Sequence, residues 1–349
     1  MRHWKAVFGV TAFAAFTSLM FGQAQQNKIT VGISWSNFQE ERWRTDESAM
    51  GQVFAFAQAE MLSTDAQASN EKQLNDIETL ISKKVDALII LALDKDTIMA
   101  AIAKAKAAKI PVIAYDRLIE DPSVFYMTFD NIEVGRMQAR EVLKVKPKGN
   151  YVFIKGDPGD PNSVFLHGGQ LEVLNPSIKS GDIKVVGEQF TEGWKPENAQ
   201  RSMEQILTRN SNKIDAVVAS NDGMAGGVIA ALTSARLAGQ VAVSGQDGDL
   251  SALNRVARGI QTVSVWKDAR TLGKKAAEVA LLLARGTPVT KIPGRMIFSK
   301  GPNKVRMNSI FIKPVPITRA NLKVVLDAKW INKSVLCEGV DRTVITECK

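Results

Sequence analysis

Residues 85–117, VDALIILALDKDTIMAAIAKAKAAKIPVIAYDR, decide the fold of this chain. The apolar run VDALIILAL (85–93) is typical of a buried strand, and IPVIAYD (110–116) is a second one. The stretch between them, DTIMAAIAKAKAAK (96–109), predicts the helix that joins the two strands. Strand, helix and strand form a βαβ unit, so we expect a parallel sheet covered by helices.

The same alternation runs through most of the chain. It begins at KITVGISW (28–35) and begins again at GNYVFIK (149–155), with no low-complexity linker between the two series. Two series of similar content predict an α/β protein with two Rossmann-like lobes and parallel sheets. The glycines of GMAGG (223–227) and TLGKKAA (271–277) match neither the dinucleotide fingerprint nor the phosphate-binding loop, which argues against a nucleotide site.

The composition excludes some classes of function. The chain has 349 residues, 45% of them hydrophobic and 23% charged, which is enough for two packed domains. Its net charge of +9 is scattered, with no basic stripe, so nucleic acid is not an expected partner. The two histidines are His3 and His167, and the sequence has no nucleophile elbow or metal-binding cluster. We therefore expect no metal, no cofactor and no histidine-based catalysis.

The first 26 residues have the layout of a secretory signal peptide. Arg2 and Lys5 precede a short apolar run that ends in the small residues of GQAQQ (22–26). We expect export to the periplasm with cleavage near Gly22–Ala24. A membrane anchor is the alternative, although the run is shorter than the ~20 apolar residues that span a bilayer. In an exported protein the two cysteines, which both lie near the C-terminus, predict a disulfide, with two free thiols as the alternative.

Polar side chains gather where the predicted strands end. Ligands of open α/β sheets bind outside the carboxyl ends of the strands, so these side chains are candidates for a site. Carboxylates, amides and guanidinium groups hold adjacent hydroxyls by strong hydrogen bonds, and a tryptophan face packs on a sugar ring, so the set suits a neutral polyol. The candidates are Asp116, Arg117, Asp157, Asp160, Asn162, Asn221, Asp222, Gln246, Asp247, Asp249, Trp266, Lys267 and Asp268, with Glu41, Arg42, Trp43 and Trp194 near other strand ends.

Several of these residues have another interpretation. Asp222 and Asp249 directly precede helices and are expected to be N-caps, and Asp46 and Asp268 can each equally be a solvated or capping residue. Each tryptophan can equally be part of a core. Asp247, paired with Asp249 or with Asp116, would suit a secreted sugar hydrolase instead of a receptor.

Seven motifs carry a family resemblance: EERW (40–43), IPVIAYDRLI (110–119), FYMTFDN (125–131), GDPGDPN (156–162), EGWKPENA (192–199), KIDAVVASNDGMAGG (213–227) and VSGQDGDL (243–250). Together and in this order they resemble the periplasmic D-xylose-binding proteins, which are type I sugar-binding proteins of ABC importers. The resemblance extends from about Lys28 to Lys323. It implies a non-enzymatic receptor that closes on one monosaccharide, D-xylose or else D-glucose or another aldose, and delivers it to an inner-membrane ABC permease. Some relatives also signal to a chemoreceptor.

The resemblance also implies the lobe boundaries and the binding residues. Residues 27–131 plus 268–311 are expected to form the first lobe, and residues 132–267 plus 312–330 the second. The tail, residues 331–349, lies outside the motifs and is expected to be a disulfide-tied surface extension, to which the sequence assigns no role. Adjacent Asp116 and Arg117 are expected to bind the sugar and to neutralise each other. The implied ligand-binding residues are Arg42, Trp43, Asp116, Arg117, Asp160, Asn162, Trp194, Asn221, Asp247 and Lys267, and the implied disulfide joins Cys337 and Cys348.

Overall fold

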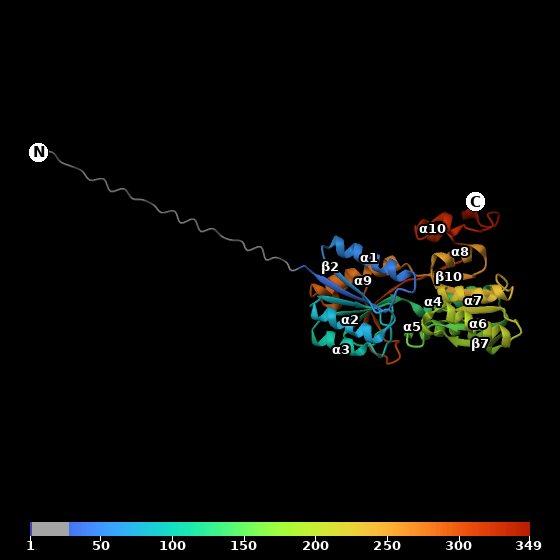
Figure 1. Ribbon diagram of the computed structural model, residues 1–349, viewed down its shortest axis with the longest axis horizontal. Coiled ribbons are helices and arrows are strands. Elements are labelled where there is room, and N and C mark those ends of the chain that lie inside the picture. Colours follow the sequence, from blue (N-terminus) through green and yellow to red (C-terminus); the bar gives the residue numbers. More distant parts are fainter. Residues whose placement is uncertain (2–27) are drawn as a thin grey trace.

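The molecule consists of two α/β lobes, each built on its own sheet. The computed structural model describes Met1 and residues 28–349, so the predicted signal peptide (1–26) and its cleavage site lie outside the described residues. Figure 1 shows the two lobes side by side, with the start of the described chain in one and its middle in the other. The predicted fold class, two lobes with largely parallel sheets, is confirmed.

The first lobe contains a seven-stranded sheet with helices on both faces. Its strand pairs are parallel except β11 with β12. Helices α1 and α9 pack together on one face, and α2 and α3 cover the other. Across the sheet the strands are β11 (Met296–Phe298), β12 (Met307–Ile312), β5 (Val124–Phe129), β4 (Val112–Tyr115), β3 (Ala87–Ile90), β1 (Thr30–Trp35) and β2 (Glu60–Asp65). The helices are α1 (Arg42–Phe56), α2 (Asn70–Ser82), α3 (Met99–Ala107) and α9 (Ala269–Ala284), with the short turn η2 (Val289–Lys291).

The second lobe contains a six-stranded sheet in which β13 is antiparallel to β10. Helix α4 packs on α5, and α6 packs on α7. Across the sheet the strands are β13 (Val315–Ile317), β10 (Val263–Trp266), β9 (Ala242–Asp247), β8 (Ala216–Ala219), β6 (Gly149–Lys155) and β7 (Ile183–Phe190). The helices are α4 (Asn131–Val145), α5 (Pro161–Lys179), α6 (Pro196–Arg209), α7 (Asp222–Ser234) and α8 (Leu250–Arg258), with the turn η1 (Glu192–Trp194). None of the helices in the described ranges is long and apolar enough to cross a membrane.

Two glycines bring α4 and α5 into backbone contact. A Cβ atom at Gly135 of α4 would lie 2.0 Å from the carbonyl oxygen of Leu166, and one at Gly169 of α5 would lie 2.0 Å from that of Ile132. Any larger residue at either position would therefore force the two helices apart. Helix α4 begins where the chain passes from the first sheet to the second, and α5 begins beside the polar ends of the strands. The tight contact therefore fixes these two helix starts relative to each other.

The chain crosses between the sheets three times. It leaves the first sheet after β5, returns to it through α9 after β10, and leaves it again between β12 and β13. The first two crossings each contain a helix N-cap: Asp130 accepts a hydrogen bond from Glu133 N, and Asp268 accepts one from Arg270 N. Strand β12 continues through Ile312, one residue past the expected boundary.

After β13 the chain forms α10 (Lys323–Asp327), α11 (Lys333–Leu336) and η3 (Thr346–Cys348), which belong to what we call the C-terminal segment, residues 322–349. Its apolar side chains form a buried cluster with α8 and Trp266, and α10 lies beside α8 in Figure 1. A disulfide joins Cys337 and Cys348. The segment thus packs on the second lobe over its whole length, including residues 331–349, for which the sequence predicts a surface extension.

Candidate functional site

The ten residues implied by the sequence motifs line one narrow pocket between the lobes, with a cavity volume of about 20 Å³. They come from the start of α1, the ends of β4, β9 and β10, the start of α5, the turn η1 and the N-cap of α7. Two further residues complete the lining. The full set is Glu40, Arg42, Trp43, Asp116, Arg117, Asp160, Asn162, Trp194, Asn221, Gln246, Asp247 and Lys267.

Two carboxylates from different lobes face the same two cations. Arg42 Nη1 lies 3.0 Å from Asp116 Oδ2 and 3.4 Å from Asp247 Oδ1. Lys267 Nζ lies 3.3 Å from Asp247 Oδ1 and 3.8 Å from Asp116 Oδ2, and all four side chains are buried. Burial raises the pKa of Asp116, but the charges of Arg42 and Lys267 outweigh burial and hold this pKa below its ordinary value. Asp116 is therefore an anionic hydrogen-bond acceptor at neutral pH.

Both carboxylates stand on left-handed backbone. The φ angle is 59° at Asp116 and 100° at Asp247, in a region that glycine adopts freely and other residues seldom do. Such positions cost about 1–3 kcal/mol each and persist where surrounding contacts hold them. At Asp116 the backbone N–H donates to Met127 O at 2.7 Å, which fixes the turn at the end of β4. In this backbone conformation both side chains line the pocket.

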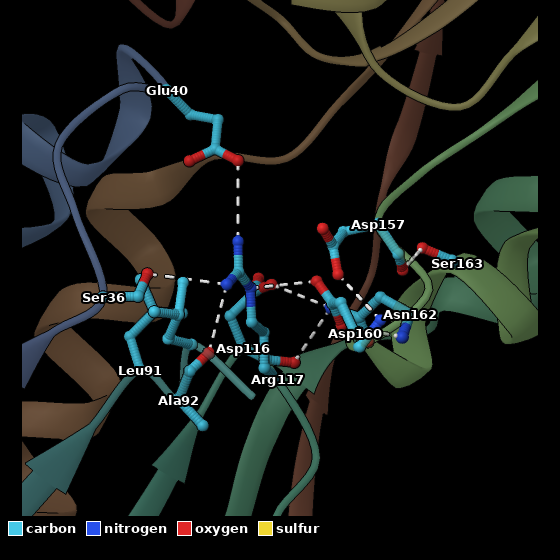
Figure 2. Close-up of polar contacts among 12 residues, drawn as sticks. Ser36, Glu40, Leu91, Ala92, Asp116, Arg117, Asp157, Asp160, Asn162 and Ser163 are labelled. Carbon is cyan, nitrogen blue, oxygen red and sulfur yellow. Dashed lines mark hydrogen bonds and ion pairs between the residues drawn. The ribbon is translucent and has the colours of Figure 1, made fainter. Parts of the chain in front are cut away.

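Arg117 is the centre of a second charged group (Figure 2). Its Nε lies 2.9 Å from Asp160 Oδ2 in the other lobe, its Nη2 lies 3.6 Å from Glu40 Oε1, and its Nη1 donates to Ala92 O at 3.1 Å. Burial raises the pKa of Asp160 to about 6, although Arg117 lowers it, and burial also raises the pKa of Glu40. Asp116 and Arg117 each have their nearest ion-pair partners elsewhere, but their charges still stabilise one another, since Arg117 lowers the pKa of Asp116 and Asp116 raises the pKa of Arg117.

Asn162 connects the two lobes at the same point. Its Nδ2 donates to Asp116 Oδ1 at 3.0 Å, and its Oδ1 accepts a hydrogen bond from Asn131 Nδ2 at 2.9 Å. Asp160 fixes the local turn by accepting from the backbone N–H of Asn162 at 2.9 Å, so that this carboxylate is both the N-cap of α5 and the partner of Arg117. The loop GDPGDPN thus attaches the second lobe to a carboxylate of the first.

The two tryptophans of the pocket belong to different lobes and are also part of the cores. Trp43 is 3% exposed and its ring centre lies 4.4 Å from the Arg42 guanidinium, while its indole N–H donates to the Glu40 carboxylate. Trp194 is 4% exposed and covers Gly156, where a Cβ atom would lie 2.1 Å from the ring. These two residues therefore belong to the cores and also line the pocket.

The N-cap of α7 differs from the prediction. Asn221, not Asp222, is the N-cap, and its side chain accepts from Met224 N at 2.8 Å. The Asp222 carboxylate is buried behind the site, where its Oδ2 accepts from Gly248 N at 2.9 Å and from Asp249 N at 3.1 Å. Asp249 occupies the N-cap position of α8 without a side-chain capping bond. Asp222 therefore supports the turn that carries Asp247.

Three contributors to the site were given no binding role from the sequence. Glu40 lines the pocket from the loop before α1, where no strand end marks it, and Gln246 was among the strand-end residues but in no assigned role. Asp46, expected to be solvated or capping, is fully buried with its Oδ2 3.3 Å from Arg42 Nε. Its Oδ1 accepts the hydroxyl hydrogen of Tyr115, and burial raises its pKa to about 7. Asp46 thus orients the Arg42 side chain without lining the pocket itself.

Polar groups of the lining remain available for a ligand. Among the described residues, the buried atoms Arg42 Nη2, Trp194 Nε1 and Gln246 Oε1 have no hydrogen-bond partner. Buried polar atoms are costly to leave unpaired, so a ligand with donors and acceptors would be favoured here. Within the described ranges, no group of three or more His, Cys, Asp and Glu side chains could hold a metal ion.

The chain is similar in sequence to known binding proteins. The periplasmic binding protein domain matches residues 31–288. The D-xylose-binding periplasmic protein of Escherichia coli is 38% identical over 301 residues, covering 83% of this chain and 91% of that protein. The protein of the same name from Haemophilus influenzae is 37% identical over 331 residues, covering 95% of this chain and 94% of that protein.

The chain is also similar to solved structures of sugar-binding proteins. An ABC transporter solute-binding protein of Clostridium phytofermentans with bound β-D-glucose is 30% identical and superposes with a TM-score of 0.79, covering 88% of this chain and 99% of that one. A carbohydrate transporter solute-binding protein of Chloroflexus aurantiacus in complex with D-glucose is 26% identical, with a TM-score of 0.80, and covers 88% of this chain and 98% of that one. On the fold, the domain match and the identity to these relatives, the chain belongs to the periplasmic binding protein family, as a type I sugar-binding protein.

Proposed function

We propose that this protein is the periplasmic receptor of an ABC sugar importer, that its ligand is D-xylose, and that the residues lining the pocket between the lobes hold the sugar. One observation carries the proposal: a single buried pocket combines carboxylates, guanidinium groups, amides and an ammonium group with two tryptophans. The proposal includes export by the predicted signal peptide and delivery to an inner-membrane ABC permease. A chemoreceptor is a further candidate partner.

The charges of the pocket suit an uncharged ligand. Its lining contains four carboxyl groups (Glu40, Asp116, Asp160, Asp247) and three cations (Arg42, Arg117, Lys267). The pKa values of Glu40 and Asp160 are raised by burial, which brings the balance closer to zero. Carboxylates accept hydrogen bonds from hydroxyl groups and the cations donate to them, so one pocket can serve both roles of each sugar hydroxyl.

We propose D-xylose rather than D-glucose as the ligand because the chain is more similar in sequence to D-xylose-binding relatives. The two D-xylose-binding periplasmic proteins are 37–38% identical to this chain, whereas the two glucose-bound structures are 26–30% identical. Glucose has one hydroxymethyl group more than xylose, and a small difference in pocket size separates the two sugars. D-glucose or another aldose is therefore the alternative ligand.

Closure of the lobes provides the transport signal in this proposal. Contacts cross the cleft between Arg117 and Asp160, between Asp116 and Asn162, and from Gln39 Nε2 to Gly193 O at 3.2 Å. A sugar bound by residues of both lobes favours the closed form by its higher affinity for that form. The permease would then distinguish loaded from empty receptor by the shape of the closed molecule.

A secreted sugar hydrolase is less well supported. The carboxylate pair suggested by the sequence includes Asp116, whose lowered pKa is opposite to what a general acid requires. Asp249, the other suggested partner of Asp247, does not line the pocket. The Asp160 carboxyl, with a pKa of about 6, and the Glu40 carboxyl, whose pKa burial also raises, are the lining groups that would suit an acid.

Isothermal titration calorimetry of the mature protein tests the proposal. D-xylose, D-glucose, L-arabinose, D-ribose and D-galactose are titrated in parallel, and each mixture is then analysed for sugar products. We expect tight one-to-one binding of xylose, weak or no binding of glucose and no turnover. Tight binding of glucose would retain the receptor and replace the ligand. Binding of none of the five sugars would refute the ligand class, and release of product would refute the receptor.

A further inference from the structure

The C-terminal segment reaches the back of the pocket through Trp330. The indole Nε1 of Trp330 donates to the carbonyl oxygen of Gly248 at 2.6 Å, and Gly248 follows Asp247 directly. The backbone N–H of Gly248 donates in the opposite direction, to Asp222 Oδ2 at 2.9 Å. The turn that carries Asp247 is therefore held from within the lobe by Asp222 and from outside by Trp330.

The same tryptophan packs on the strand that carries Lys267. The ring centres of Trp330 and Trp266 are 5.7 Å apart, and Lys267 is the next residue after Trp266. Gly248 fits tightly against this pair, because a Cβ atom there would lie 2.4 Å from Trp266 Cδ1. Trp330 thus contacts the chain immediately beside both members of the pair formed by Asp247 and Lys267, whose charged atoms are 3.3 Å apart.

Trp330 also lies against the first lobe. Arg270, in the first turn of α9, has its guanidinium 5.0 Å from the centre of a Trp330 ring and donates to Ala328 O at 3.0 Å. Later residues of α9, such as Leu272, belong to the core of the first lobe. The C-terminal segment is therefore joined to both lobes at the crossing formed by residues 267–268.

We infer that Trp330 is a positioning residue of the sugar site: it fixes the Gly248 carbonyl and the Trp266 ring, and through them the positions of Asp247 and Lys267. Trp330 itself is not part of the pocket lining. The inference rests on the proposed function for its effect on sugar binding, but the ordering of the Asp247 turn is a property of the protein alone. A positioning role for Trp330 gives a reason why the C-terminal segment, which lies outside the binding motifs, is packed against α8 and closed by a disulfide.

The test compares Trp330→Phe, Trp330→Ala and the control Ile345→Ala with the wild-type protein. Trp330→Phe keeps a ring against Trp266 and loses the hydrogen bond to Gly248. Ile345 is buried in the same apolar cluster, so its truncation loosens the segment without removing that bond. Two quantities are measured: the Kd of the sugar by calorimetry, and amide hydrogen exchange of residues 242–253 in the sugar-free protein.

We expect Trp330→Phe to raise the Kd about 5- to 10-fold, as for the loss of one buried hydrogen bond, and Trp330→Ala to raise it further. Exchange at residues 247–249 should be faster in both variants, whereas Ile345→Ala should lower the unfolding temperature and leave the Kd unchanged. Wild-type Kd and exchange in both Trp330 variants would overturn the inference, as would an equal rise in Kd for Ile345→Ala. If the wild-type protein binds no sugar, the exchange measurement alone decides. Faster exchange in the Trp330 variants supports the positioning role, so that only the proposed function fails. Unchanged exchange overturns the positioning role.

Discussion

Arg117 and Asp160 form an ion pair across the cleft, with Nε and Oδ2 2.9 Å apart and both side chains buried. Arg117 follows β4 of the first lobe, and Asp160 caps α5 of the second. Because its partners belong to different lobes, separation of the lobes would break the pair, and we expect it to contribute to the free energy of closure. Removing one partner of such a pair leaves the other charge buried and unpaired, which typically costs about 3–5 kcal/mol.

A double-mutant cycle measures this coupling. We expect Arg117→Ala and Asp160→Ala each to lower the sugar affinity, and the double variant to lose less than the sum of the two, with a coupling free energy of ~0.5–3 kcal/mol. The four proteins are compared by calorimetry under one set of conditions. Strictly additive effects would show that the pair does not contribute to closure.

Loss of the Asp247 carboxylate should weaken binding. Asp247→Ala leaves Arg42 and Lys267 with one buried carboxylate fewer, so we expect the binding free energy to fall by ~1–3 kcal/mol or more. Asp247→Asn keeps an acceptor of the same shape and should lose less. Calorimetry gives the Kd, and a thermal scan shows that the variants are folded. A wild-type Kd in Asp247→Ala would remove this residue from the site.

Neighbouring glycines of α5 provide a matched stability test. Gly169→Ala would place a Cβ 2.0 Å from the backbone oxygen of Ile132 in α4, and this overpacking should lower the free energy of unfolding by ~1–3 kcal/mol. Gly168, one residue earlier, has no atom within 4 Å of a built Cβ, so Gly168→Ala should be neutral or stabilise by up to ~1 kcal/mol. Urea unfolding compares the two variants. Equal unfolding midpoints would mean that α4 and α5 are not in backbone contact in solution.

The stability of the protein should rise as the pH falls from 8 to 5. Burial raises the pKa of Asp46 to about 7, of Asp160 to about 6 and of Asp222 to about 7. An unfolded Asp titrates near 3.9, so between these values the native state binds more protons than the unfolded state and is stabilised by acid. His167 opposes this trend below about pH 6.5, because burial lowers its pKa. Asp116, with a lowered pKa, loses its contribution only below about pH 4.

Thermal unfolding at several pH values checks the sign. A net gain of 1 kcal/mol would raise the unfolding temperature by roughly 2–4 °C in domains of this size. Asp46→Asn removes one titrating group while keeping the shape of the side chain, and it should flatten the pH dependence. An unfolding temperature that falls steadily from pH 8 to pH 5 would contradict the raised pKa values.

Replacement of both cysteines by serine should separate stability from affinity. The disulfide closes a short loop, with a sequence separation of 11 residues, and its removal should destabilise the C-terminal segment by about 3 kcal/mol. The apolar cluster on α8 remains, so Trp330 should keep its place and the Kd at 25 °C should not change. Unfolding curves and calorimetry are measured on the same sample. A large loss of affinity would show that the apolar contacts alone cannot hold the segment.

Much of the site was predictable because strand ends of a parallel sheet converge. The residues that follow β4 and those that end β9 and β10 come together for that reason, and the sequence motifs identify them. Glu40 was not predictable, because it lies in a loop whose path depends on the packing of α1. The partners of Arg117 were not predictable either, since Asp160 reaches it only through the relative placement of the two lobes.

The fold shows a similar division. The βαβ alternation predicts both sheets, but it assigns no helix between the strands at residues 124–129 and 149–155, where α4 (Asn131–Val145) lies. The C-terminal segment follows no α/β pattern, and its role depends on Trp330 meeting Gly248, 82 residues earlier in the chain. Contacts over such a distance leave no periodic signal in the sequence.

The position of β12 has a consequence for biogenesis. The first sheet needs β12 (Met307–Ile312) beside β5, and its core needs α9, so the lobe whose strands leave the ribosome first cannot be finished until about nine-tenths of the chain has been made. A growing chain therefore stays without a complete native lobe throughout most of its synthesis. Under the proposed export, such a delay would keep the polypeptide in a form that a channel for unfolded chains can thread, and native packing would then begin on the far side of the membrane.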